Sequence, residues 1–162
     1  MQTLSLQDDF GDLDGTAQAD AIQLIAFSVG EQTYGVEITT VREIRAWNGA
    51  TPLPNSRDFV RGVINLRGTI VPIFDLRARF GGGQTDPGKT HVVVVLSVGE
   101  KWVGILVDAV SDILTVGASA IHAIPDGQGV EGALLKGLIT HDGKMVGLID
   151  LHAVIAQGRA EG

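Results

Sequence analysis

The chain has 162 residues, no cysteine and a formal net charge of −7. Without cysteine, neither disulfides nor thiolate metal sites can form. No apolar run approaches the roughly 18 residues that a membrane helix needs, and the N-terminus lacks the basic and apolar parts of a secretory signal. These features predict a soluble cytoplasmic protein. The 18 valines and 14 isoleucines, against eight aromatic residues, favour β-structure.

The acidic charge is concentrated at the N-terminus. Seven acids precede the first basic residue, Arg42, and account for the whole net charge. Residues 1–20, rich in Asp, Gln, Gly and Thr, are therefore expected to form a disordered acidic leader. Beyond it, residues 22–85 hold seven arginines and five acids, whereas residues 90–158 hold three lysines and seven acids. This difference reflects either ordinary drift of solvated surfaces or complementarity that serves partners or head-to-tail packing.

The chain contains an internal duplication. Residues 28–44 (SVGEQTYGVEITTVREI) align without a gap with residues 97–113 (SVGEKWVGILVDAVSDI), and 7 of 17 positions are identical. Residues 59–80 align in the same way with residues 134–155, with 7 of 22 positions identical. Two copies of this length indicate a duplicated small domain, because a solenoid has shorter and more numerous units.

The first copy is predicted to form five short strands and a short helical segment. Gly30-Glu31 and Arg67-Gly68 are typical of tight turns between strands. Pro72 favours an edge position for its strand, and Asp75 is a candidate N-cap for the helical segment. The strands are expected at Ile22–Val29, Gln32–Ile38, Val41–Trp47, Phe59–Leu66 and Thr69–Phe74, and the helical segment at Asp75–Phe80.

The second copy repeats this order and predicts a second small barrel. Its hairpin turn, Asp142-Gly143, is the dipeptide that a type I′ turn prefers. Its strands are expected at His91–Val98, Lys101–Val107, Val110–Val116, Leu134–Thr140 and Lys144–Ile149, with Asp150 as N-cap of a helical segment at Asp150–Gln157. We therefore expect an all-β fold of two tandem barrels, because closure removes exposed sheet edges. The first subdomain is expected at residues 21–85 and the second at 86–162, with exchange of strands between them left open.

The segment between the copies matches a nucleotide-binding pattern. Gly83–Thr90 satisfies G-x-x-x-x-G-K-[ST], which provides a second functional hypothesis, a P-loop nucleotide-binding protein. A P-loop needs a strand before it and a helix that begins at the Lys-Thr. Here the following Val92–Val95 is a poor helix start and a good buried strand. The sequence therefore favours a linker over a nucleotide site.

The remaining chemistry-bearing residues predict no catalytic, metal or cofactor site. The four histidines show no metal-ligand spacing, and no serine lies in a G-x-S-x-G elbow. His141-Asp142 lies at a hairpin tip, where solvated turn residues are expected. We therefore expect a protein that is not an enzyme and that carries no metal ion or cofactor.

Comparison of the copies selects an arginine and an acid. Arg67 takes the turn position that Asp142 holds in the second copy, although turn preference does not demand an arginine there. The alternative is an ordinary exposed arginine. Glu43 aligns with Asp112, so an acid recurs at this place in both copies.

Two valines accompany these acids. Because alternate residues of a strand share a face, Val41 is expected to point the same way as Glu43, and Val110 the same way as Asp112. Such pairs would flank a groove between two pseudo-symmetric halves. The alternative is that both valines belong to the core.

Three motifs in order resemble the CheW family of chemotaxis coupling proteins. They are YGVEITTVREI (34–44), FVRGVINLRGTIVPIFDLR (59–77) and VGILVDAVSDIL (103–114), and the resemblance runs from about Ile22 to Ile155. It implies two tandem SH3-like five-stranded barrels, with short helical segments, and no catalytic activity. It also implies an adaptor that couples the cytoplasmic tip of methyl-accepting chemotaxis receptors to the regulatory domain of the CheA histidine kinase.

The resemblance assigns roles to individual residues. The functionally sensitive glutamate of the family falls on Glu43 and its arginine on Arg67, as residues that couple receptor and kinase, while the receptor groove falls on Val41 and Val110. Because the kinase domain shares the fold, the resemblance implies head-to-tail rings of adaptor and kinase. It also implies recruitment to membrane-associated receptor arrays without insertion into the membrane, and no nucleic-acid partner.

Overall fold

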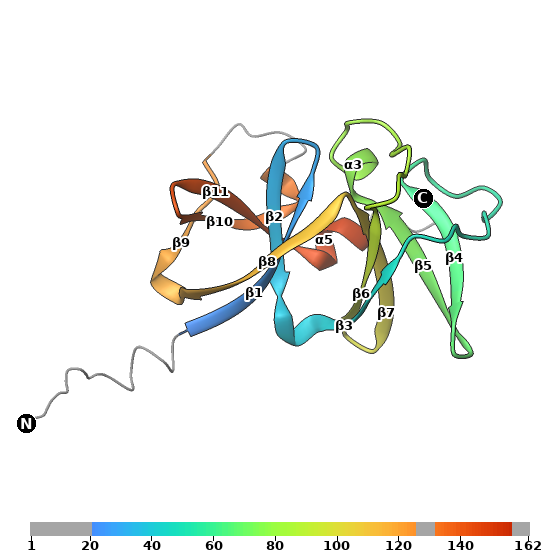
Figure 1. Cartoon of the computed structure of the whole chain (residues 1–162), viewed down its shortest axis with the longest axis horizontal. Coiled ribbons are helices and arrows are strands. Elements are labelled where there is room, and N and C mark those ends of the chain that lie inside the picture. Colours follow the sequence, from blue (N-terminus) through green and yellow to red (C-terminus); the bar gives the residue numbers. More distant parts are fainter. Residues whose placement is uncertain (1–20, 126–131, 157–162) are drawn as a thin grey trace, which may run out of the picture.

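The structure is a computed structural model that describes residues 21–125 and 132–156. The predicted acidic leader and the end of the second helical segment lie outside these residues. The described part is built mainly of strands, which form two sheets, and each sheet corresponds to one of the expected barrels (Figure 1). The all-β class with two tandem barrels is confirmed.

The six-stranded sheet has the order β8-β1-β2-β11-β10-β9. Its strands are β1 (Ala21–Val29), β2 (Gln32–Glu37), β8 (Ala109–Gly117), β9 (Ile121–His122), β10 (Leu135–His141) and β11 (Lys144–Ile149). The five-stranded sheet has the order β3-β6-β7-β5-β4. Its strands are β3 (Val41–Ala46), β4 (Val60–Leu66), β5 (Thr69–Asp75), β6 (Val92–Val98) and β7 (Lys101–Val107).

The two sheets exchange strands between the sequence copies. β1 and β2 come from the first copy but lie in the sheet with β8, β10 and β11 of the second. β6 and β7 come from the second copy but lie in the sheet with β3, β4 and β5 of the first. Two parallel pairings join the exchanged strands to their hosts, β2 to β11 and β5 to β7. The expected boundary near residue 85 therefore separates the two copies in sequence but not the two sheets.

The predicted turn at Asp142-Gly143 and the two predicted helix caps lie where expected. Asp142 and Gly143 have φ angles of 53° and 78°, as a type I′ turn requires. Asp75 accepts the Ala78 N–H at 3.3 Å and Asp150 accepts the Ala153 N–H at 3.1 Å. These bonds cap α3 (Leu76–Arg79) and α5 (Leu151–Ala156).

The edge position predicted from Pro72 is wrong. β5 lies between β7 and β4 in the sheet. The ladder between β5 and β7 runs only from Ile73 to Asp75, however, so Pro72 lies just before it begins. The proline is tolerated in an interior strand because this ladder does not include it.

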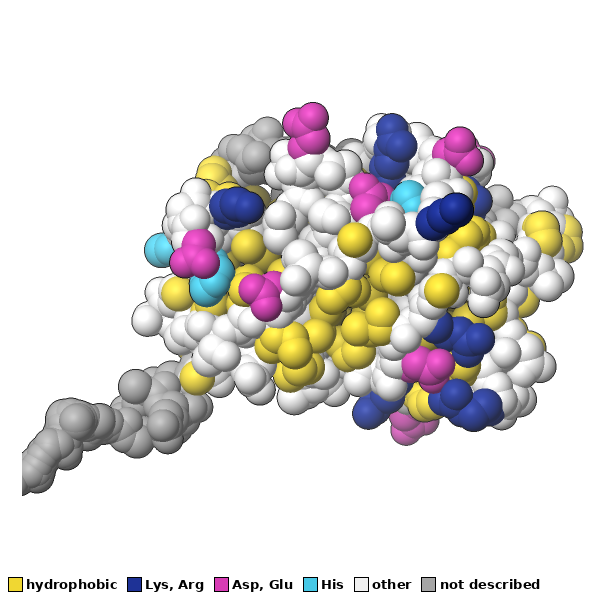
Figure 2. Space-filling model, viewed as in Figure 1, with side chains coloured by type: hydrophobic (Ala, Val, Ile, Leu, Met, Phe, Trp, Pro, Cys, Tyr) yellow, Lys and Arg dark blue, Asp and Glu magenta, His cyan; other side chains and the backbone are white. Residues whose placement is uncertain are grey.

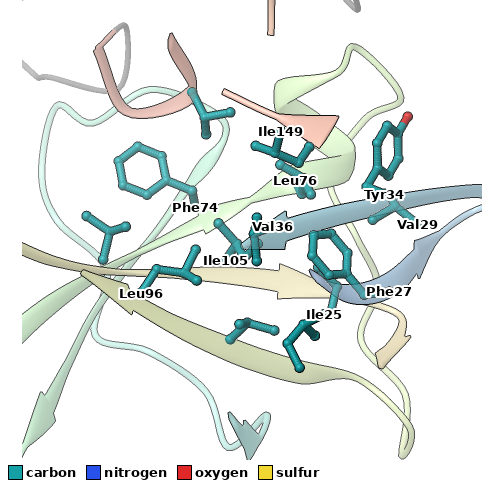
Figure 3. Packing of buried hydrophobic residues seen from close by; sticks show 14 of the residues in the cluster. Ile25, Phe27, Val29, Tyr34, Val36, Phe74, Leu76, Leu96, Ile105 and Ile149 are labelled. Carbon is teal, nitrogen blue, oxygen red and sulfur yellow. The ribbon is translucent and has the colours of Figure 1, made fainter. Parts of the chain in front are cut away.

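The largest cluster of buried residues lies between the two sheets (Figure 3). It includes Phe27 of β1 and Leu96 of β6, which occupy equivalent positions in the two copies and are both 0% exposed. A smaller cluster fills each sheet separately, with Leu24 and Ala26 in one and Val93 and Val95 in the other. The central strands are thus buried on both faces, which explains their continuous apolar runs. Because the exchanged strands contribute to both kinds of cluster, the barrels form one packed unit.

A buried arginine joins the two helices across this central core. Arg79 is 6% exposed and donates to the carbonyl oxygens of Ala153 and Val154, at 3.2 and 3.0 Å. Its guanidinium lies 4.7 Å from the centre of the Phe59 ring. Burial, and to a smaller degree Arg57, lowers the pKa of Arg79. These bonds satisfy carbonyls at the end of α5, which would otherwise lack intrahelical partners.

Candidate functional site

Val41 and Val110 occupy equivalent, half-buried positions in the two sheets. Val41 of β3 is paired with Leu96, and Val110 of β8 is paired with Phe27. Both valines pack against the central cluster without being enclosed by it. The alternative interpretation, that both valines belong wholly to the core, does not fit this partial exposure.

The acids do not share a face with these valines, contrary to the expectation from alternation. The register of β3 shifts between Val41 and Glu43, so Val41 lies opposite Leu96 and Glu43 lies opposite the adjacent Val95. Because opposed residues point to the same face of a sheet, Val41 faces the central cluster and Glu43 the other side. The extra residue of a β-bulge causes this change.

The second copy carries the same bulge. Val110 is paired with Phe27, whereas Asp112 is paired with Ala26. Phe27 belongs to the central cluster and Ala26 to the cluster of the six-stranded sheet. The valine and the acid of each copy thus belong to two different surfaces.

The surface of the valines continues through two exposed isoleucines. Ile44 is paired with Val94 and Ile113 with Ile25, and both partners lie in the central cluster. The isoleucines are 41% and 53% exposed. We call the apolar surface formed by Val41, Ile44, Val110 and Ile113 the inter-sheet groove, after the groove expected from the sequence. Figure 2 shows hydrophobic side chains gathered between the two sheets on the face where β3 and β8 lie.

Glu43 and Arg67 form an ion pair at the end of the five-stranded sheet. The Arg67 guanidinium donates to Glu43 Oε1 at 2.9 Å, and Arg45 lies 3.5 Å from Glu43 Oε2. The side chain of Arg67 is 68% exposed and that of Glu43 is 27% exposed. In Figure 2, basic side chains with acidic ones among them gather near β3 and the β4–β5 hairpin. The two residues selected separately from the sequence are therefore one unit.

The turn itself keeps Arg67 outside the sheet. Arg67 and Gly68 both have positive φ angles, 52° and 91°. The Gly68 N–H donates to Asn65 Oδ1 at 2.8 Å, which holds the turn in this form. A positive φ is uncommon for an arginine, so local turn preference does not explain the choice of residue.

The Gly83–Thr90 segment lacks the geometry of a P-loop. It follows α3 and leads to β6, which begins at Val92, so no helix starts at its Lys-Thr. Thr85 instead donates its hydroxyl and its N–H to Asp75, both at 2.6 Å. Arg61 completes this contact by donating to the Thr85 carbonyl at 2.9 Å. The segment is a linker anchored to the first helix cap.

The profile of the CheW-like domain family matches residues 23–159. The chain belongs to the CheW family. This confirms the resemblance carried by the three sequence motifs.

Individual relatives agree with this assignment. A probable chemotaxis protein CheW from Rhizobium etli is 45% identical over 140 residues, which cover 86% of this chain and 90% of the relative. A chemotaxis protein CheW from Rhizobium meliloti is 44% identical over 140 residues, with the same coverage. The crystal structure of the scaffolding protein TtCheW from Thermoanaerobacter tengcongensis has a TM-score of 0.77 and 30% identity, and the match covers 83% of this chain and 87% of that one.

Membership in the CheW family makes this chain a chemotaxis scaffold or adaptor rather than an enzyme. Among the residues that the structure describes, no three His, Cys, Asp or Glu side chains are grouped so that they could hold a metal ion. Within the same residues, no helix is both long and apolar enough to span a membrane.

Sequence reasoning missed two features of the CheW-type surface. It did not pair Glu43 with Arg67, because 24 residues separate them and only the packing of β3 near the β4–β5 hairpin brings them together. It also missed Ile44 and Ile113. The sequence did contain a signal for the isoleucines. Ile44 and Ile113 are aligned and identical in the two copies, and neither lies in a turn that would require a particular residue.

Proposed function

We propose that this chain is a non-catalytic adaptor that couples the cytoplasmic tip of methyl-accepting chemotaxis receptors to the regulatory domain of the CheA histidine kinase. The observation that carries the proposal is the inter-sheet groove, an apolar surface built from equivalent residues of both copies. Family membership supplies the kinds of partner. The groove supplies a surface that suits one of them.

The receptor tip is assigned to the groove. A helical hairpin docks by laying apolar side chains into an apolar cleft. Val41 and Val110 are half-buried against the central cluster, and Ile44 and Ile113 expose further apolar surface on the same faces.

The kinase is assigned to the ends of the barrels, away from the groove. Glu43 lies on the other face of β3 from Val41, and Arg67 reaches it from the β4–β5 turn, so a partner can contact the ion pair while the groove is occupied. The first half of the chain is more basic than the second. This difference supports head-to-tail alternation of adaptor and kinase in rings, and recruitment to receptor arrays follows from binding both partners.

Co-sedimentation with receptor-containing membranes and with purified kinase tests the proposal. Val41→Glu and Val110→Glu should each weaken receptor binding and leave kinase binding nearly intact, because both side chains lie on the groove and not at the barrel ends. Met145→Glu, at a strand residue that is 54% exposed and lies outside the groove, is the matched control.

Circular dichroism separates loss of binding from loss of fold. A carboxylate at a half-buried position can reach water, whereas a fully buried one costs several kcal/mol. Folded variants that lose receptor and kinase together would show that the two surfaces are not separate. Folded variants that keep receptor binding would remove the groove from the proposal.

A further inference from the structure

The six-stranded sheet has a pocket, whereas the equivalent place in the five-stranded sheet is filled by side chains. The pocket holds about 270 Å³ and lies beside the β10–β11 hairpin. Its deepest residues are Ala26, Leu114 and Val146, which are 2%, 5% and 3% exposed and belong to the core of this sheet. Its polar lining consists of Ser28, Thr33, Ser111, Asp112, His141, Asp142 and Lys144. The site thus combines an apolar floor with a charged rim.

The same place in the other sheet is filled by large apolar side chains. Thr33 is paired with Ser28, as Trp102 is paired with Ser97. Trp102 packs there against the cluster of the five-stranded sheet. His141 corresponds in the same way to Leu66, which is 1% exposed. In the six-stranded sheet, Thr33 replaces this tryptophan and His141 replaces this leucine, and the space that the larger apolar side chains would fill is the pocket.

The acids at the two places also differ in their partners. Glu43 lies beside two arginines of its own chain, Arg67 and Arg45. The equivalent of Arg67 in the second copy is Asp142 and that of Arg45 is Leu114. Among the described residues, no cation lies within ion-pair distance of Asp112, which accepts only the N–H of Ile113, at 2.8 Å.

The rim has an excess of carboxylates. Asp142 lies 3.5 Å from His141, and its side chain is 86% exposed. In the part of the chain that the structure describes, Lys144 is the one lysine or arginine that lines the pocket, against the two carboxylates of Asp112 and Asp142. The rim therefore has one more carboxylate than it has lysine or arginine side chains. In Figure 2, acidic, histidine and basic side chains surround this end of the sheet, near β10 and β11.

We propose that this pocket binds an arginine side chain of a partner protein. The first barrel holds an arginine against its acid in cis, and the second barrel keeps the acid while lacking the arginine. The methylenes of an inserted arginine would lie on the apolar floor. Its planar guanidinium would donate to the carboxylates of Asp112 and Asp142, since such forks match carboxylate geometry.

The size of the pocket supports a single side chain as the occupant. Small-molecule sites usually enclose about 300–1,000 Å³, and this pocket is slightly smaller, at about 270 Å³. A free cofactor or nucleotide would also meet two carboxylates at the rim. An arginine side chain is small enough for this volume, and its positive charge matches the two carboxylates. The protein that carries it can also bury neighbouring apolar groups against the rim.

Titration of the full chain with N-acetyl-arginine amide tests the proposal, with amide NMR shifts as the measurement. Shifts are expected at Ser28, Thr33 and Asp142, and they should weaken as salt is added. N-acetyl-citrulline amide has the same shape without the charge and should bind at least about threefold more weakly, as expected for loss of an exposed ion pair. Agmatine has the guanidinium and a second cationic group, its free amine, but no peptide groups, and it distinguishes a free amine metabolite from a protein side chain.

Two substitutions locate the binding and one is its control. Asp112→Asn should weaken binding of the arginine probe at least about threefold. Asp142→Arg should abolish it, because it places a cation where Arg67 lies in the first barrel, at a similar φ of 53° against 52°. Glu43→Gln, at the equivalent acid of the first barrel, should leave it unchanged. If Asp142→Arg does not fold, Thr33→Trp provides a second way to fill the pocket.

Several outcomes would overturn the proposal. Equal binding of the arginine and citrulline probes would show that charge is not recognised. Unchanged shifts in Asp112→Asn would place the probe elsewhere. Tighter binding of agmatine than of the capped arginine would assign the pocket to a free amine rather than to a protein. Each readout is independent of receptor and kinase, so failure here leaves the proposed adaptor function untouched.

Discussion

The two barrels descend from one duplicated sequence, and they keep equivalent strand pairing beside the central core while they differ at their ends. Val41 with Leu96 and Val110 with Phe27 show that the pairing is equivalent in both sheets. The end of the five-stranded sheet is covered by a tryptophan and an ion pair, while the end of the six-stranded sheet is open. Duplication thus preserved the groove on the shared face and allowed the two ends to acquire different chemistry.

The largest expected difference concerns equivalent glycines of β4 and β10. Gly62 has a φ of 134°, and a Cβ there would overlap the carbonyl oxygen of Thr51. Gly137 would instead meet the Ile121 side chain, which can shift. Gly62→Ala should cost about 3 kcal/mol of unfolding free energy through backbone strain and loss of the Thr51–Val63 bridge, and Gly137→Ala about 1–2 kcal/mol. Urea unfolding checks this order, and equal costs would contradict it.

The next comparison concerns the two helix caps. Asp75 is 0% exposed and accepts bonds from Thr85 as well as from Ala78. Asp75→Ala should cost about 2–3 kcal/mol, because it leaves the Thr85 donors buried without partners. Asp150 is only partly buried, so Asp150→Ala should cost about 1 kcal/mol, as for an ordinary N-cap. Similar melting temperatures for the two variants would show that the linker contact contributes nothing.

A smaller difference is expected at the glycines of β2 and β7. A Cβ on Gly104 would lie 2.6 Å from its nearest atom, Ile73 Cδ1, whereas a Cβ on Gly35 would lie 3.4 Å from its nearest atom, the Ile25 carbonyl oxygen. Gly104→Ala should therefore cost about 1–2 kcal/mol through overpacking. Gly35→Ala should be neutral or slightly stabilising, because alanine loses less backbone entropy than glycine. Thermal unfolding checks the pair, and a larger loss at Gly35 would reverse the conclusion about packing.

The smallest effect on stability should come from the exposed ion pair. A double-mutant cycle of Glu43→Gln and Arg67→Ala should give less than about 1 kcal/mol of coupling, since exposed pairs contribute little. Receptor-dependent activation of the kinase should nevertheless fall in Arg67→Ala if the pair serves partners. Arg77→Ala removes another exposed arginine and is the control. Full activation by a stably folded Arg67→Ala protein would exclude this role.

The local features of the fold were accessible from the sequence because their causes are local. Asp142-Gly143 predicted its turn, and Asp75 and Asp150 predicted their helix caps, since each depends on bonds within a few residues. The repeat alignment also selected Val41 and Val110 correctly as equivalent positions. The prediction that Glu43 shares the face of Val41 failed, because a bulge depends on the partner strand and leaves no signal in simple alternation.

The sequence by itself determined the duplication, the strand order within each copy and the family of this chain. Only the tertiary structure decided which sheet each strand joins, because an exchanged pair and an unexchanged pair have the same local pattern. It also brought Arg67 to Glu43 and left Asp112 beside an open pocket. These outcomes depend on long-range contacts between side chains far apart in the chain. Such contacts form when the exchanged strands pack around the central core.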